Sequence, residues 1–214
     1  MGRLRGFVHA LIDTLLPPRA RAVRLRSTHA LSIAPRSDTV LDTRIVTLSP
    51  YHAPGVEDAI RALKYDGNAR AATLLADALA DFLREEIAHV RSMSPRPILL
   101  VPMPLHRSRK RERGFNQIER VLARLPGEFH DGTLSRVETR GLFRTRATRQ
   151  QTTLSRTERL QNVRGAFSAD RTRITGAHLF LIDDVCTTGA TLSACVHAAE
   201  EAGARVSAIA LARA

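Results

Sequence analysis

Tryptophan is absent from this chain of 214 residues, and aromatic residues make up only 4% of it. Proteins that bind single-stranded nucleic acid by stacking bases need several aromatic side chains. This chain therefore has few side chains from which such a stacking surface could be built. The sequence also has no apolar run of 18 residues, so we expect no transmembrane helix.

Cysteine is almost absent as well. Cys186 and Cys195 are the only two, their spacing fits no zinc signature, and a disulfide framework needs more. The eight histidines are scattered along the chain, so no histidine-based metal cluster is indicated. We expect reduced thiols and a cytoplasmic protein.

Lysine is the third scarce residue, because Lys64 and Lys110 are the only lysines among 33 basic residues. The net charge is nevertheless +12, with a pI near 11.3. Residues 105–164 hold 15 basic and 6 acidic residues, which is +9 of that total. A basic block of this kind indicates polyanionic ligands, nucleic acid or simply a solvated face.

The N-terminal part differs in pattern from the rest. Residues 4–16 carry one apolar helical stripe, which predicts a helix docked on the body, on a partner or on a membrane surface. Residues 19–43 show weak periodicity and are interpreted as a linker or a poorly packed segment. We therefore divide the chain into an N-terminal helix and linker at 1–43 and a main domain at 44–214.

In the main domain, apolar runs alternate with helical patterns, which is typical of a parallel α/β sheet flanked by helices. We expect strands at 45–48, 98–101, 133–137, 179–183 and 206–211. We expect helices at 56–63, 69–90, 115–125 and 150–160, and another that begins near Ala190 and is capped by Gly203. Residues 139–153 are rich in arginine and poor in apolar residues, which predicts a mobile loop.

The most informative stretch runs from Leu179 to Leu192. A buried strand leads into Asp183 and Asp184, then into a short Thr- and Gly-containing turn and a helix. A helix N-terminus with free backbone N–H groups is an anion site, and Gly189 allows close approach of a ligand. Acids beside a phosphate cradle suit a sugar phosphate, because carboxylates accept hydrogen bonds from ribose hydroxyls.

A second phosphate-like feature follows the predicted strand at 98–101, where a basic loop at 105–114 ends in Gly114. Ligands of doubly wound sheets bind at the carboxyl ends of the strands. This loop and the one after Asp184 are therefore expected to face one crevice.

The stretch around Asp183 resembles the phosphoribosyl-pyrophosphate motif of type I phosphoribosyltransferases. Four segments together resemble the ComF family of competence-associated phosphoribosyltransferase-like proteins: Ile60–Gly67, Val101–Gln117, Gln151–Phe167 and Phe180–Leu192. They occur in order and cover most of the chain. The resemblance implies a type I phosphoribosyltransferase-like fold with a small hood at about 44–68.

The resemblance also implies that phosphoribosyl pyrophosphate, or a similar phosphosugar, binds with Mg²⁺ held through the ligand and with no direct protein metal site. Asp183 and Asp184 would be the catalytic acids at the ribose, and the 139–153 loop would be a lid. The 5′-phosphate would be held by Thr187, Thr188, Gly189, Ala190 and Thr191, and the candidates for the pyrophosphate are Arg107, Arg109, Lys110, Arg111 and Arg113. Val185, Cys186 and Lys64 are further candidate substrate-binding residues.

Two departures from the resemblance bear on function. The family usually continues from its first helix into a Cys-rich module, but Ala20 and its neighbours include no cysteine, so zinc is not predicted. Enzymes acting on 6-oxopurines place an Asp where this chain has Thr187. That favours an amine or an already anionic nucleophile.

Two other functions stay open from the sequence. A protein of DNA uptake would bind single-stranded DNA through the basic block, without chemistry. A sensor would bind phosphoribosyl pyrophosphate or nucleotides but would not catalyse the transfer. The acceptor and the oligomeric state have no signature in the sequence.

Overall fold

The computed structural model describes residues 24–145 and 165–214. In chain order the elements are β1 (Arg36–Val40), β2 (Thr43–Pro50), α3 (Val56–Asp66), α4 (Ala69–Met93), β3 (Ile98–Pro102), α5 (Arg107–Arg113), α6 (Gln117–Leu122), the 3-10 helix η1 (Gly127–Phe129), β4 (Arg136–Val137), β5 (Leu142–Arg144), β6 (Phe167–Ala169), α8 (Arg171–Ile174), β7 (His178–Cys186), α9 (Ala190–Glu201) and β8 (Arg205–Arg213). The predicted helices at 4–16 and 150–160 lie outside the described residues.

The main sheet has six strands in the order β1-β2-β8-β7-β3-β4. Each neighbouring pair from β2 to β4 is parallel, and only the edge strand β1 is antiparallel to its neighbour. β5 and β6 form a separate antiparallel pair. This is the α/β class with a mostly parallel sheet that the alternating pattern predicted.

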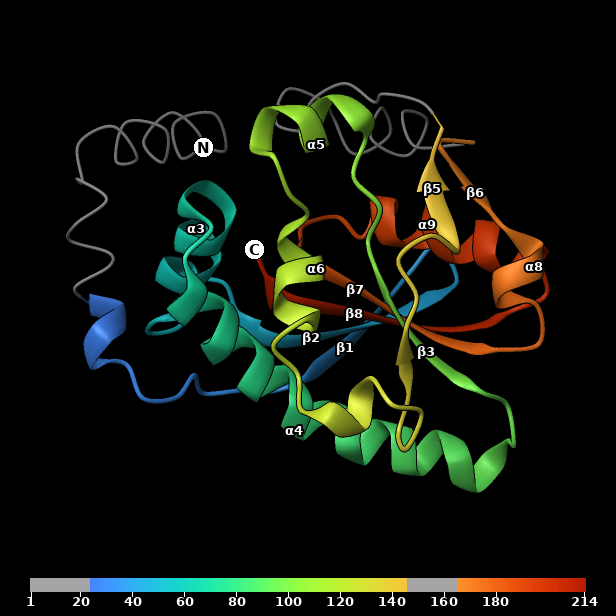
Figure 1. The fold of residues 1–214 in the computed structure, drawn as a ribbon, viewed down its shortest axis with the longest axis horizontal. Coiled ribbons are helices and arrows are strands. Elements are labelled where there is room, and N and C mark those ends of the chain that lie inside the picture. The colour runs from blue at the N-terminus through green and yellow to red at the C-terminus, as the bar shows by residue number, and fades with distance from the viewer. Residues whose placement is uncertain (1–23, 146–164) are drawn as a thin grey trace.

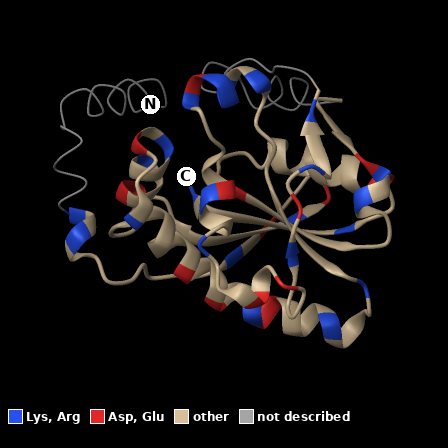
Figure 2. Ribbon diagram, in the orientation of Figure 1, with Lys and Arg blue, Asp and Glu red and all other residues tan. Residues whose placement is uncertain are grey.

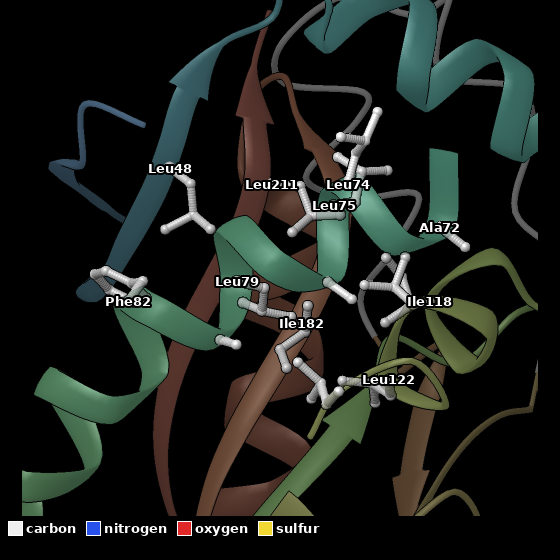
Figure 3. Close-up of a cluster of buried hydrophobic side chains, with 14 of the residues drawn as sticks. Leu48, Ala72, Leu74, Leu75, Leu79, Phe82, Ile118, Leu122, Ile182 and Leu211 are labelled. Atoms are coloured by element: carbon white, nitrogen blue, oxygen red, sulfur yellow. The ribbon is translucent and has the colours of Figure 1, made fainter. Parts of the chain in front are cut away.

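Apolar side chains fill both faces of the sheet, as a parallel sheet requires. Along β7, Phe180 and Ile182 join a cluster with α3, α4 and α6, whereas Leu179 and Leu181 join a second cluster with α9. Figure 3 shows Ile182 beside Leu79 of α4 in the first cluster. Helices therefore cover both faces of the sheet (Figure 1). This burial is the main stabilising term of the fold.

Three local predictions need correction. Residues 19–43 are not all linker, since residues 36–40 form β1 and Leu25 and Leu31 are buried in the core. The predicted boundary at 43/44 falls inside the β1–β2 hairpin. β2, which begins the predicted hood at 44–68, is an internal strand of the sheet.

Four more differences concern the bounds of single elements. The predicted basic loop contains the seven-residue helix α5, which ends at Gly114 with φ near 80°. The strand expected to end at Asp183 continues to Cys186, because β8 pairs with it that far. Within the expected loop at 139–153, residues 142–144 form β5, and 146–153 lie outside the described residues. Only residues 136–137 of the expected strand at 133–137 are extended.

The described residues include no helix that combines the length and the apolar character needed to cross a membrane.

The turn between β7 and α9 packs against the β1–β2 hairpin. Gly189 has φ near 75°, and a Cβ at this position would lie 2.7 Å from Ile45 Cδ1 and 3.1 Å from Val40 Cγ2. One turn further along α9, Ser193 Oγ and Thr43 Oγ1 share a hydrogen bond of 2.9 Å. The glycine is therefore required by its own backbone conformation and by the hairpin that supports the start of α9.

Substitution Gly189→Ala is expected to destabilise the fold through both causes. A left-handed backbone costs an L-residue about 1–2 kcal/mol, and overpacking adds ~1–3 kcal/mol. Gly176→Ala is the matched control, because Gly176 has φ near 79° but no atom within 4 Å of an added Cβ. Urea unfolding measures both variants, and equal losses of stability would contradict the packing role.

Candidate functional site

The predicted anion site lies where β7 turns into α9. Gly189 caps α9, a helix of 12 residues, so the unpaired N–H groups of its first turn point away from the helix at this turn. Thr188 Oγ1 is buried and has no hydrogen-bond partner among the described residues. A buried hydroxyl of this kind costs free energy unless a ligand or water satisfies it. The turn therefore has the donors that an anion needs.

Asp184 is the best-connected residue of the site. It is 6% exposed, and its Oδ2 lies 3.0 Å from Lys64 Nζ and accepts a hydrogen bond of 2.8 Å from Gln117 Nε2. The amide oxygen of Gln117 in turn accepts a hydrogen bond from Arg113 Nη1. Four side chains from α3, α5, α6 and β7 thus form one chain of polar contacts.

Lys64 reaches Asp184 because the end of α3 is held in place. Gly67 ends that helix with φ near 58°, and a Cβ there would lie 2.2 Å from the Arg120 guanidinium and 3.3 Å from the Phe115 ring. Arg120 stacks 3.7 Å above Phe115 and donates a hydrogen bond of 2.7 Å to the Gly67 carbonyl. The resemblance segments Ile60–Gly67 and Val101–Gln117 therefore meet here.

Gln117 is held just as firmly. The preceding residue, Asn116, is 3% exposed, donates to the Met103 carbonyl at 3.0 Å and accepts from the Ile118 N–H at 2.9 Å. It therefore caps α6 and ties its start to the residue that follows β3.

The two acids differ in protonation. Burial, reinforced by the neighbouring Asp184, raises the pKa of Asp183 from its ordinary 3.8 to about 7, although the Asp184 N–H, Lys64 and Arg144 act in the opposite direction. Burial alone would raise the pKa of Asp184 too, but the charge and hydrogen bonds of Lys64 and Gln117 lower it below its ordinary value. Asp184 is thus the ionised acid, and Asp183 exchanges its proton near neutral pH.

The predicted basic residues are only partly brought to the acids. Arg113 joins them through Gln117, and Lys64 joins them directly. Lys110 pairs with Glu119 at 3.4 Å. Figure 2 shows basic residues along most of α5. Four of them are exposed: Arg107, Arg109, Lys110 and Arg111.

The remaining predicted residues of the turn have mixed surroundings. Thr187 is exposed, Val185, Thr188 and Thr191 are half-buried, and Ala190 is buried at the start of α9. Cys186 is buried, and its Sγ accepts a hydrogen bond of 3.0 Å from Arg213 Nη1. Cys186 therefore anchors the turn to β8.

Two site residues were missed from the sequence. Gln117 was quoted only as part of a resembling segment, and Arg144 only as part of an arginine-rich loop. Arg144 stacks 5.2 Å from the Phe167 ring on the β5–β6 pair. Burial lowers the pKa of Arg144, as does the charge of Arg109, whereas Asp183 raises it. The signals in the sequence were the place of Gln117 at the end of the segment Val101–Gln117 and the place of Arg144 in the arginine-rich stretch at 139–153.

The described residues contain no group of three or more His, Cys, Asp or Glu side chains that could hold a metal ion. Asp184 is already paired with Lys64.

The raised pKa of Asp183 predicts a pH-dependent stability. The folded state keeps a proton that the unfolded chain releases near pH 3.8, so stability should fall as pH rises from about 4 to 7. Asp183→Asn should remove this slope and be more stable than wild type at about pH 8, with the smallest difference at or below about pH 4. Asp77→Asn, an exposed site on α4, is the control. Urea unfolding across this range that gave Asp183→Asn the wild-type slope would contradict the assignment.

No model of a known protein family matches the sequence. The chain is similar to individual proteins, however. It is 32% identical over 152 residues to the DNA utilization protein YhgH of Escherichia coli K12, which covers 70% of this chain and 63% of that protein. It is 31% identical over 150 residues to the competence protein ComFC of Streptococcus pneumoniae, which covers 70% of this chain and 59% of that protein.

Among solved structures, the chain is similar to orotate phosphoribosyltransferase of Mycobacterium tuberculosis, with a TM-score of 0.38, 11% identity, and coverage of 90% of this chain and 80% of that one. The chain spans less than two thirds of the length of the two curated relatives described above. Their identity over 70% of this chain confirms the resemblance to the ComF family that the four segments indicated: the chain is a homologue of the competence and DNA-utilization proteins.

Proposed function

We propose that this chain binds phosphoribosyl pyrophosphate, or a closely similar phosphosugar, together with Mg²⁺. We further propose that it transfers the phosphoribosyl group to a nucleophile with release of pyrophosphate. The observation that carries the proposal is the pairing, on one strand–turn–helix unit, of an ionised buried acid with an unsatisfied anion site: Asp184 and the Thr188 hydroxyl at the start of α9.

Each end of such a ligand would have a matching group. The 5′-phosphate would bind the N–H groups of the turn at 187–191 and the Thr188 hydroxyl. The ribose hydroxyls would donate to Asp183 and Asp184, which are acceptors when ionised. The pyrophosphate would bind Lys64 and Arg113, because cations stabilise the charge that develops on a departing anion.

Mg²⁺ would be held mainly through ligand oxygens, beside Asp183 and Asp184, and would neutralise pyrophosphate charge. The protein's own contribution is to fix the reacting carbon between the acids and the cations. Lys64 would exchange part of its contact with Asp184 for the pyrophosphate as the ribose hydroxyls arrive.

The acceptor is constrained by Thr187, which occupies the place of the Asp used with 6-oxopurines. Without that base, an amine or an anionic nucleophile is the class of acceptor we propose. The names of the relatives connect the family with competence and DNA utilization, and we propose that the reaction serves that process. Because so highly charged a ligand does not enter a bilayer, we place the activity in the cytoplasm.

Isothermal titration of phosphoribosyl pyrophosphate with Mg²⁺ tests the binding step. We expect heat with the wild type, and affinity weakened about tenfold or more for Asp184→Asn, because each hydrogen bond to a charged group contributes roughly 1.5–3 kcal/mol. Asp77→Asn should bind as the wild type does.

No heat with the wild type would overturn the proposal. Binding without pyrophosphate release across a panel of amines and bases would favour the sensor. Binding of single-stranded DNA that survives Asp183→Asn and Asp184→Asn, without phosphosugar binding, would favour the DNA-binding alternative.

Thr188→Val separates a binding role from a structural one. Removing a buried hydroxyl that lacks a partner should leave the free protein as stable or more stable, while phosphosugar affinity falls about tenfold. Thermal unfolding and titration on the same samples measure both effects. Loss of stability together with unchanged affinity would contradict the assignment.

A further inference from the structure

We propose that Gln117 is a positioning residue that aims Arg113 at the pyrophosphate end of the ligand, with Asp184 as its anchor, and so sets the preference for a pyrophosphorylated over a plain ribose 5-phosphate. This inference rests on the proposed function. It is carried by the continuous contact of Arg113, Gln117 and Asp184, in which the amide stands between a guanidinium and a carboxylate.

The amide group has one orientation in this position. Its oxygen accepts from Arg113 Nη1, and its NH₂ donates to Asp184 Oδ2 at 2.8 Å. A guanidinium offers only donors and an ionised carboxylate only acceptors, so a flipped amide would oppose both partners. A carboxylate at 117 would suit Arg113 but repel Asp184, and an apolar side chain would suit neither.

Gln117 itself has little freedom to move. It is 4% exposed and opens α6, directly after the Asn116 cap that is tied to the Met103 carbonyl. A buried side chain on a fixed backbone transmits the position of one partner to the other. The guanidinium of Arg113 is thereby held relative to the acid that would bind the ribose.

Arg113 differs from the other basic residues of α5 in this respect. It is half-buried, whereas the four other cations of this helix are exposed. A guanidinium has five N–H donors in a fixed fork. Contact with one amide oxygen therefore leaves donors for a ligand. Its side chain also loses less freedom on binding, because Gln117 already holds it.

A phosphate at C5 alone would not reach Arg113, since that phosphate is assigned to the turn before α9. Only a ligand that carries a second anionic group, at the anomeric carbon, would form a contact with Arg113. Gln117 should therefore affect the affinity for phosphoribosyl pyrophosphate and leave that for ribose 5-phosphate nearly unchanged.

The test is a double-substitution cycle read by titration with two probes, phosphoribosyl pyrophosphate with Mg²⁺ and ribose 5-phosphate. We expect Gln117→Leu to weaken binding of the first about tenfold, as loss of a charge-assisted hydrogen bond does, and that of the second less than about threefold. Arg113→Met should have the same effect, and the double variant should be no worse than either single one. Arg124→Met, which removes an exposed cation just after α6, is the control for loss of charge.

A merely structural role would lower the melting temperature and weaken both probes equally, and that result would overturn the inference. If Gln117→Leu does not fold, Gln117→Met is measured in its place with the same two probes. Additive effects of the two substitutions would also overturn it. If the wild type binds ribose 5-phosphate and phosphoribosyl pyrophosphate equally well, this inference falls and the phosphosugar site stands. If the wild type binds neither, both fall.

Discussion

A carboxylate buried in a protein must be surrounded by opposite charge and hydrogen-bond donors, because the interior solvates it poorly. Asp184 meets this requirement with Lys64 and Gln117, which come from different helices. Removing one partner of such a pair typically costs about 3–5 kcal/mol. The arrangement of α3 and α6 at the end of β7 therefore depends on this one acid. The same requirement gathers cations at the place where we propose that a phosphorylated sugar binds.

The second support of the site is steric. The turn before α9 fits under the β1–β2 hairpin at Gly189, and Arg213 of β8 donates to Cys186 at its other end. The turn is thus held from both sides before any ligand arrives. Preorganised donors cost no reorganisation when charge develops. A strand that the sequence reading took for linker consequently contributes to the rigidity of the anion site.

The acids show how neighbouring groups of one type can take different roles. Asp183 and Asp184 are adjacent in the chain, but only Asp184 contacts Lys64 and Gln117. Successive residues of a strand point to opposite faces of the sheet, so the two carboxylates have different surroundings. Burial then raises the pKa of one, and ion pairing lowers that of the other.

Much of the fold followed from the sequence. Apolar runs bounded by turns gave the main strands, and 3.6-residue periodicity gave α4 and α9, because burial of one face or both is written in the order of residues. The turn with Gly189 and the acids before it were also predicted from the sequence, because the pattern of an apolar strand, two acids and a Gly-containing turn is specific. β1 was not predicted, because its residues are mostly exposed and it is extended only through pairing with β2. Nor could Gln117 be singled out, because nothing in an isolated segment shows which buried charge its amide will face.

The sequence by itself therefore determined the α/β class, the family resemblance and the strand–turn–helix unit that carries the acids, because all of these are local patterns. Only the tertiary structure decided which basic side chains lie near the acids. Lys64 contacts Asp184 and Arg113 contacts Gln117, whereas the other cations of α5 are exposed. The physical reason is that charge pairing acts through space over a few ångströms. Residues 64, 113, 117 and 184 become neighbours only when the helices pack on the sheet.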